Sequence, residues 1–340
     1  MQNTKKEFYT HYIALDWSQE VVAMATMRNS SSRVELNTFP PDTAIAKRML
    51  KKYSGKKILT IEETTTSHWL YVELKESVNK IIICDPYKNN LMKDGPQTDK
   101  IDARNLCLLL RNGMLKEVYH TLDKNYELRK LVSAYEDTVK ASVRLKNQRS
   151  AIFRSEGQDH KKGRILSKSK INKFITEKQI ESIEYFQTLR EEYESIFEKI
   201  EIEKENKIIK QLKKISGIGR KIAIMIYATV IDANRFENKY KYWAYCGLVK
   251  YYKESGGKNY GSKKVRYSKL LKRCYKSAAL AAINGNNDIR EYYEYLIKHG
   301  ESFENARNQI ARYIAKVSYA VMKNDIEYRA YQWRESKNRN

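Results

Sequence analysis

Two aspartates three residues apart, Asp99 and Asp102, have the types and spacing that could perform chemistry in this sequence. They precede the apolar run 106–110, which predicts a buried helix, and Thr98 is a suitable N-cap for that helix. A spacing of three places both carboxylates on one helix face, close enough to share a hard cation. Acids in a first turn also complement the helix dipole, so this pair alone indicates a helix start more strongly than a metal site.

Further acids follow two predicted strands of the same region. Asp16 ends the first strand, and Glu62 and Glu63 stand side by side after a later one. With Asp99 and Asp102, Asp16 and one glutamate would supply four oxygen donors, which suit two Mg²⁺ ions in phosphodiester cleavage. Alternation of side chains along a strand end leaves open which glutamate takes part. No histidine or cysteine clusters with these acids, which argues against zinc.

The elements that must position these acids alternate between strand and helix. The predicted strands are 12–17, 21–25, 33–39, 57–61 and 80–84, and the predicted helices of this region are 43–53 and 68–77. An opening hairpin followed by such alternation predicts an α/β domain with a mixed sheet over residues 1–120.

Residues 121–212 predict a charged helical segment. Residues 122–153 form one long predicted helix, and a heptad seam follows at Phe186, Leu189, Tyr193, Ile196 and Ile200. The basic, glycine-containing stretch 157–173 lies between them, so we expect a helical hairpin or coiled coil with a basic tip. Packing within one chain and dimerisation both fit the seam.

Residues 213–340 predict a mainly α-helical domain, which ends in the amphipathic helix 305–322. It opens with Ile215–Ala223, which has the form of a helix-hairpin-helix turn. Gly217 and Gly219 would let the backbone approach a phosphate, and the next helix would present its N-terminus to it.

The chain carries a net charge of +24, and its cations are clustered. Residues 161–173 hold six Lys or Arg and residues 258–276 hold eight, with no acid in either stretch. Such stripes neutralise phosphates, so nucleic acid is the expected partner. The candidate contacts are Lys161, Lys162, Arg164, Lys168, Gly217, Gly219, Arg220, Lys221, Lys258, Lys263, Lys264 and Arg266.

The cysteines and the hydropathy pattern exclude several classes of protein. Cys84, Cys107, Cys246 and Cys274 are scattered without a CxxC pair, so neither structural zinc nor a disulfide framework is expected. The start of the chain lacks the pattern of a signal peptide, and no stretch approaches 18 apolar residues. We therefore expect a cytoplasmic protein without membrane contact.

In the first part, the acidic motifs resemble those of the DEDD-type insertion-sequence transposases, the RNA-guided bridge recombinases. A first strand ends in Asp16, and a later one ends in Glu63, with small residues after it and an aromatic residue, Trp69, six positions on. That spacing favours Glu63 over Glu62. Residues 98–103 match the family's Thr-Asp-x-x-Asp-Ala run. The resemblance implies a RuvC-like, RNase H-type fold in which the catalytic Mg²⁺ ligands are Asp16, Glu63, Asp99 and Asp102.

The last part resembles the family's C-terminal transposase domain. The matching pieces are residues 217–219, Asp232, Arg235-Phe236, residues 247–249 and Ser255-Gly256. The family's nucleophilic serine lies in that Ser-Gly step, so Ser255 inherits the role; without the resemblance it would be a polar turn residue. The chain departs from the family at Thr66 and at Tyr267-Ser268, where glycine is common.

The resemblance implies a site-specific DNA recombinase that acts through a 5′-phosphoserine intermediate. A structured noncoding RNA would choose donor and target DNA, and the acids and serine of one site would come from different protomers. A dimer on each DNA and a tetramer at synapsis follow from that arrangement. Two alternatives remain: a RuvC-like nuclease or resolvase that uses metal-activated water, and a non-catalytic nucleic-acid-binding relic.

Overall fold

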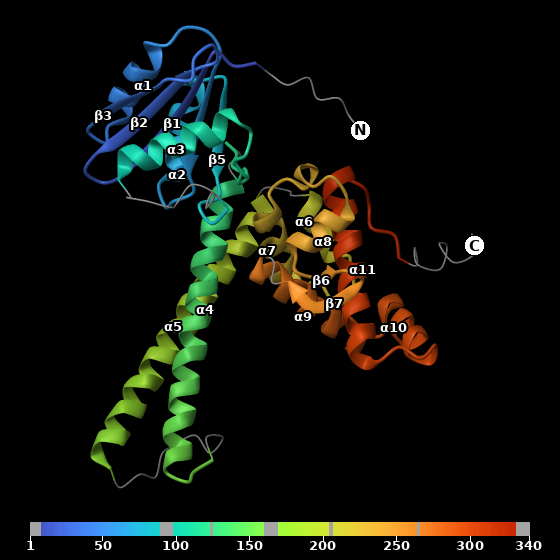
Figure 1. The fold of residues 1–340 in the computed structure, drawn as a ribbon. Helices are drawn as coiled ribbons and strands as arrows, with labels where there is room; N and C mark the ends of the chain where they lie inside the picture. The colour runs from blue at the N-terminus through green and yellow to red at the C-terminus, as the bar shows by residue number, and fades with distance from the viewer. Residues whose placement is uncertain are drawn as a thin grey trace. The chain divides into compact units, whose positions relative to one another are not determined.

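The computed structural model describes residues 8–88, 98–122, 125–159, 169–203, 207–263 and 266–330. Its contacts group into two compact units, Met1–Leu122 and Asp123–Asn340, which are described separately here (Figure 1). The division into three parts at residues 120 and 212 stays a prediction. The described residues contain no helix with the length and apolar character needed to cross a membrane.

The first unit is built on a five-stranded mixed sheet with the order β3-β2-β1-β4-β5. The strands are β1 (His11–Trp17), β2 (Val22–Arg28), β3 (Val34–Phe39), β4 (Lys57–Glu62) and β5 (Lys80–Cys84). The first three form an antiparallel meander, and β4 and β5 run parallel to β1. The predicted mixed α/β sheet is confirmed, and its strand order is consistent with an RNase H-like fold.

Helices cover both faces of this sheet. On one face lie α1 (Thr43–Lys51), α2 (Ser67–Leu74) and the one-turn 3₁₀ helix η1 (Lys75–Ser77), packed on large apolar side chains of the strands. On the other face lies α3 (Asp99–Arg111), packed on β1 and β2. The strand residues under α3 are small, among them Ala14, Ala23 and Ala25, and this lets the helix lie close to the sheet.

The start and the end of α3 are both fixed. The Thr98 hydroxyl accepts a hydrogen bond from the Ile101 amide, so the predicted N-cap is confirmed. At the other end, the Arg111 guanidinium donates to the carbonyl oxygens of Ser31 and Asn29, at 2.6 and 3.1 Å. These contacts hold the first turn of α3, and the two aspartates on it, over the end of β1.

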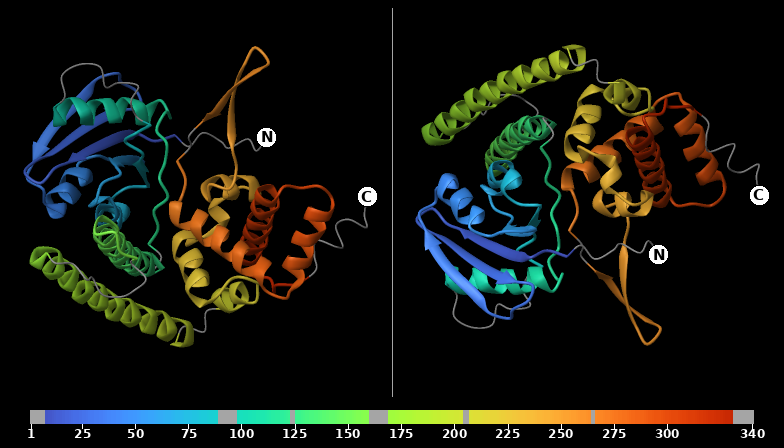
Figure 2. Two further views of the ribbon diagram at one scale, coloured as in Figure 1. Left: turned by 90° about the horizontal axis from the view of Figure 1, so that it is seen from below. Right: turned by 90° about the horizontal axis from the view of Figure 1, so that it is seen from above.

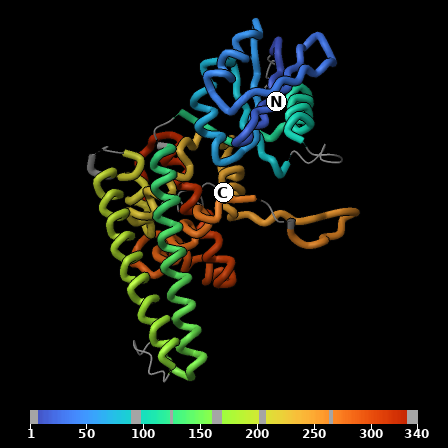
Figure 3. Tube along the Cα trace, turned by 90° about the vertical axis from the view of Figure 1, so that its left-hand side faces the viewer, coloured from blue at the N-terminus to red at the C-terminus, as the bar shows by residue number. Residues whose placement is uncertain are grey.

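The second unit contains the predicted helical hairpin, formed by α4 (Asn125–Ser155) and α5 (Lys170–Glu203), which run side by side (Figures 1 and 3). Packing within the chain accounts for the seam near its base, where the ring of Tyr135 meets Tyr193 and Phe197. The predicted seam is wrong at one position: Ile196 is 39% exposed, whereas Phe197 is fully buried. The spacing of 3.6 residues per helical turn moves the contact by one residue there.

The remaining helices share one hydrophobic core with the base of the hairpin. They are α6 (Lys207–Lys213), α7 (Arg220–Val230), η4 (Ala233–Arg235), α8 (Lys239–Tyr245), α9 (Lys269–Asn284), α10 (Asp288–Lys298) and α11 (Phe303–Asn324). The region from residue 213 is mainly helical as predicted, and it also contains two strands that were not predicted, β6 (Tyr251–Ser255) and β7 (Lys258–Lys263), which form an antiparallel ribbon. This ribbon extends away from the helices of its own unit (Figure 2).

Gly217 allows two helical segments to approach closely. It has a φ of 87°, and a Cβ added there would lie 2.1 Å from the carbonyl oxygen of Ala278 in α9. We expect Gly217→Ala to destabilise the protein by about 3 kcal/mol, because both the backbone angle and the contact would be strained. Denaturant unfolding of the full chain measures this.

The matched control is Gly219→Ala. Gly219 is the N-cap of α7, has a φ of −82°, and has no atom within 4 Å of an added Cβ. Its loss of stability should stay within about 1 kcal/mol. Equal losses in the two variants would contradict the close-packing account of Gly217.

Candidate active site and nucleic-acid contacts

Asp16 lies near the end of β1 and on the face of the sheet that α3 covers. Side chains alternate along a strand, so Asp16 shares a face with Ala14, which packs under α3. The first turn of that helix carries Asp99 and Asp102, and all three aspartates are half-buried. The structure therefore places the three predicted aspartates on the same side of the sheet, near the end of β1.

The electrostatics of Asp16 identify its neighbours. The pKa of Asp16 is raised from 3.8 to about 6, first by burial and then by the negative charges of Asp99, Asp102 and Glu62. Charged oxygens that repel one another in a half-buried place favour a bound cation. Glu62, the alternative to Glu63 at the end of β4, is one of the acids that act on Asp16 in this way, and which glutamate serves as the fourth ligand stays a prediction.

The alternation of side chains on β4 explains that grouping. Ile61 pairs with Leu15 of β1, and both side chains belong to the core under α1 and α2. Glu62 is the next residue and the last of the strand, so its side chain takes the opposite face, the one that Asp16 occupies.

Glu63 follows the strand and has a different set of contacts. Its Oε2 lies 2.6 Å from Nε2 of His120, whose side chain is only 4% exposed. The Ser67 hydroxyl donates to the same oxygen at 3.5 Å, and the rings of His120 and His68 stack with their centroids 5.8 Å apart. Glu63 is therefore held beside the sheet end by a buried histidine.

The chemistry of the acidic group fits a divalent metal ion. Asp16, Glu62, Asp99 and Asp102 supply carboxylate oxygens, the donors that Mg²⁺ prefers. Across the described ranges, no three His, Cys, Asp or Glu side chains lie close enough together to hold a metal ion. Because ionised carboxylates repel one another, a cation would be needed to draw these side chains together.

Ser255 belongs to the other unit. It is the last residue of β6 and pairs with Lys258 across the turn Gly256-Gly257. Both glycines have positive φ, 55° and 72°, which matches a two-residue hairpin turn of type I′. Ser255 is exposed, so a phosphate can reach its hydroxyl.

Other predicted nucleic-acid contacts fall into three groups. The first group lies outside the described residues and consists of Lys161, Lys162, Arg164, Lys168 and Lys264. The second group belongs to the ribbon and the segment after it: Lys258 and Arg266 are exposed, as are the ribbon residues before Lys263 in β7.

The third group, at the predicted helix-hairpin-helix turn, is engaged within the protein. Arg220 NH1 lies 2.8 Å from Glu198 and Lys221 Nζ lies 2.7 Å from Glu194, both on α5. The backbone of Gly217 packs directly against α9. Their role in binding DNA stays a prediction, and these contacts give the motif a structural explanation.

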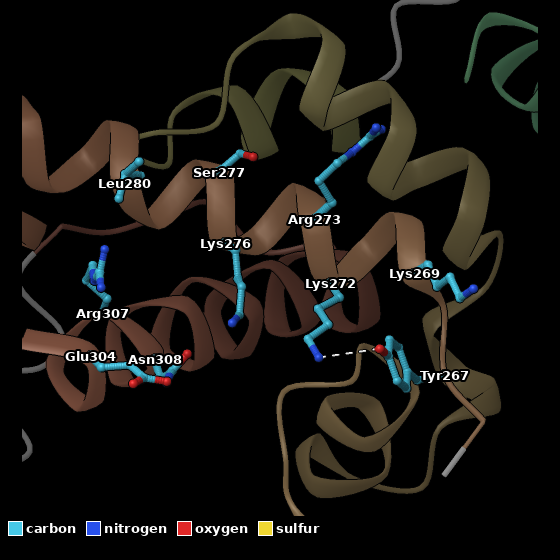
Figure 4. A pocket seen from close by; sticks show the side chains of 10 residues that line it. All are labelled: Tyr267, Lys269, Lys272, Arg273, Lys276, Ser277, Leu280, Glu304, Arg307 and Asn308. Carbon is cyan, nitrogen blue, oxygen red and sulfur yellow. Dashed lines mark hydrogen bonds between the residues drawn. The ribbon is translucent and has the colours of Figure 1, made fainter. Parts of the chain in front are cut away.

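A basic cleft of about 600 Å³ opens along α9 and the start of α11 (Figure 4). It is lined by Tyr267, Lys269, Lys272, Arg273, Lys276, Ser277, Leu280, Glu304, Arg307 and Asn308. Arg273 is paired with Glu136, and the Lys272 amine lies 4.6 Å from the centre of the Tyr267 ring. The sequence indicated the α9 cations, but Arg307 and Asn308 were missed because only helix packing brings them here.

A mixed sheet whose central strands end at clustered carboxylates is consistent with the RNase H-like class of metal-dependent enzymes that act on nucleic-acid phosphates. A DEDD transposase model of the IS110 type matches residues 13–155, and the Transposase IS116/IS110/IS902 family model matches residues 209–294. The chain therefore belongs to the IS110-type DEDD transposases of insertion sequences. A search among curated proteins gave no match.

Membership in this family fixes the coarse function. The protein is a DNA transposase, its substrates are DNA, and its DEDD domain implies dependence on a divalent metal, typically Mg²⁺.

We expect Asp16→Asn to raise the stability of the metal-free protein at pH 7.5 by about 1–2 kcal/mol, screening included. The pKa of Asp16 is raised from 3.8 to about 6, so its contribution to folding is complete below pH 3.8 and is lost as pH rises through about 6. Mg²⁺ should stabilise the native chain at pH 7.5 but not this variant. Thermal unfolding with EDTA or Mg²⁺ measures both effects, with exposed Glu20→Gln as control.

The two neighbouring glutamates provide a matched pair. We expect Glu62→Gln to lower DNA cleavage in Mg²⁺ by at least about 100-fold, because it removes a proposed metal ligand. Glu63→Gln should cost about 10-fold or less, because it keeps a hydrogen-bonding group toward His120. A larger loss for Glu63→Gln would instead assign the ligand role to Glu63.

Proposed function

We propose that this transposase is a site-specific recombinase that cuts and rejoins donor and target DNA through Ser255, guided by a structured noncoding RNA. One observation carries the proposal: an exposed serine beside the turn of a projecting ribbon, in a chain whose other unit gathers four carboxylates. The family match to residues 209–294 spans the ribbon and supports its importance for transposition.

The proposed chemistry is a direct transfer of a DNA phosphate to Ser255. The serine oxygen attacks phosphorus, the new O–P bond forms, and the bond from phosphorus to the 3′ oxygen breaks. The hydroxyl proton leaves to solvent, and the departing 3′ oxygen takes up a proton to become a free hydroxyl. The product is a 5′-phosphoserine, and attack on it by another 3′ hydroxyl rejoins the strand in the reverse reaction.

The carboxylates have a separate role in this scheme. Asp16, Glu62, Asp99 and Asp102 would hold Mg²⁺, with Glu62 in place of the Glu63 expected from the resemblance. Bound Mg²⁺, two ions per site as four oxygen donors suit, would offset the negative charge that develops on the attacked phosphate. Glu63, held by His120, would fix the chain at the end of β4 so that Glu62 keeps its face of the sheet.

The acids and the serine lie in separately folded units, Met1–Leu122 and Asp123–Asn340. This separation supports a composite site in which one protomer supplies the acids and another the serine. A dimer on each DNA and a tetramer at synapsis would then be the active assembly.

The charge distribution supports nucleic-acid binding by the second unit. The cleft along α9 presents Lys269, Lys272 and Lys276, and α11 adds Arg307. Such cations bind backbone phosphates without reading the base sequence. In the proposed function, base pairing with the guide RNA therefore chooses the DNA sites, and the protein holds the backbone.

A second candidate is a resolvase-like nuclease in which activated water attacks the phosphate. It is favoured by the fact that the carboxylate group is complete within the first unit and needs no serine. The two candidates differ in one product, because only the serine mechanism links protein to DNA.

We expect Ser255→Ala to abolish the covalent protein–DNA adduct, which a denaturing gel detects after reaction with a matched donor duplex. Cleavage should fall by about 1,000-fold or more, because the nucleophile is removed. Ser262→Ala is the control, since Ser262 is an exposed serine on the other strand of the same ribbon.

Unchanged cleavage by Ser255→Ala, without an adduct, would establish the water mechanism instead. A parallel reaction after ribonuclease treatment tests the guide, because loss of the RNA should remove adduct formation at the chosen site. Full activity in that reaction would contradict RNA guidance and leave the serine result intact.

A further inference from the structure

The register of the ribbon places different chemistry on its two faces. Ser255 pairs with Lys258, and the adjoining pair is Glu254 with Asn259. Residues that lie directly opposite each other share a face, and successive residues alternate. Ser255 and Lys258 therefore lie on one face, and Glu254 and Asn259 lie on the other.

A bulge in β7 keeps this separation along the ribbon. Between the pairs Tyr252–Ser262 and Glu254–Asn259, β6 contributes only Lys253, whereas β7 contributes Tyr260 and Gly261. Gly261 absorbs the extra residue with a φ of 94°, and its amide donates to the Asn259 side chain at 2.8 Å. Tyr260 thus stays opposite Lys253.

The two faces can now be defined. The serine face carries Lys253, Ser255, Lys258 and Tyr260, and the glutamate face carries Tyr252, Glu254, Asn259 and Ser262. Of these eight residues, the four on the serine face include two cations and no acid, whereas the four on the glutamate face include one acid and no cation. All eight residues are exposed, so solvent accessibility does not distinguish the faces.

We propose that the serine face is the surface on which the scissile DNA strand lies, with Lys258 contacting the phosphate that Ser255 attacks. The inference rests on the proposed role of Ser255 and adds to it the orientation of the ribbon and a further catalytic residue. Cβ atoms of directly opposite residues lie about 5 Å apart, so a lysine amine and a serine hydroxyl can reach the same phosphate.

The charge and type of each side chain on the serine face determine the contact with DNA that we assign to it. The protonated Lys258 amine offsets the negative charge on the phosphate oxygens while the Ser255–phosphorus bond forms, and it exchanges no proton. Lys253 lies two residues from Ser255, about 7 Å along the strand, and contacts the backbone beyond the attacked phosphate. Tyr260 supplies an aromatic ring against the same strand.

The two faces of the ribbon carry matched residues that can serve as controls for each other in mutagenesis. Tyr252 and Tyr260 are 59% and 65% exposed and lie on opposite faces, so they are the same residue type in comparable surroundings. Ser262 likewise lies on the glutamate face, opposite to Ser255.

The test uses the full chain with its RNA and a duplex that carries the insertion-sequence end. We expect Lys258→Met to slow formation of the Ser255–DNA adduct by about 100-fold while DNA affinity changes by less than about 5-fold. Lys258→Arg, which keeps the charge, should recover at least about 10-fold of that rate. Lys253→Met and Tyr260→Ala should weaken DNA binding about 3- to 10-fold, and Tyr252→Ala and Ser262→Ala should leave it unchanged.

Two results would overturn the inference: adduct formation at the native rate in Lys258→Met, or equal losses of affinity in Tyr252→Ala and Tyr260→Ala. Thermal unfolding verifies that each variant is folded, which the exposure of the ribbon leads us to expect. Native cleavage by Ser255→Ala would refute the serine mechanism instead. The tyrosine pair would still decide which face meets DNA, because its readout is affinity.

Discussion

The repulsion among half-buried carboxylates at the end of β1 is the constraint on which the first unit depends. Asp16, Asp99, Asp102 and Glu62 are held near one another although each raises the cost of ionising Asp16. The rest of the unit supplies the energy for this arrangement. Small residues under α3 let the helix lie close, the Thr98 cap starts it at the right residue, and Arg111 ties its end to the β2–β3 turn. A bound cation would relieve this repulsion, so the arrangement favours cation binding.

The same constraint explains the different environments of Glu62 and Glu63. A strand sends consecutive side chains to opposite faces, so only one of two adjacent acids can join Asp16. The other would remain as an uncompensated negative charge close to the group, and a contact with buried His120 holds it away. In the proposed function the pair would divide two tasks: Glu62 would add charge to the group, and Glu63 would anchor the chain where β4 ends.

The sequence predicted those features that local patterns specify. The strands, the sheet type and the α3 cap follow from periodicity and residue type, and all three are confirmed. Features that depend on packing between distant segments were not predictable. The face of the sheet that Glu62 takes depends on the register of β4 against β1. The burial of Phe197 depends on the path of the α4–α5 contact, and the place of Arg307 in the basic cleft depends on α11 packing beside α9. The ribbon was not predicted from the sequence, because its exposed strands lack the alternation of apolar and polar residues that identifies a strand.

The two halves of the proposed site are each unreactive alone, and this follows from their surroundings. A serine hydroxyl on an exposed ribbon is a weak nucleophile until a base or a neighbouring charge activates it. A cluster of carboxylates repels a DNA phosphate until a cation neutralises it. Reaction then requires that the ribbon, the acids, the metal and the DNA meet, which in the proposed mechanism occurs only in the assembled complex. Placing the nucleophile outside the acidic unit thus makes strand cleavage conditional on assembly, and an unassembled chain bound to DNA would leave it intact.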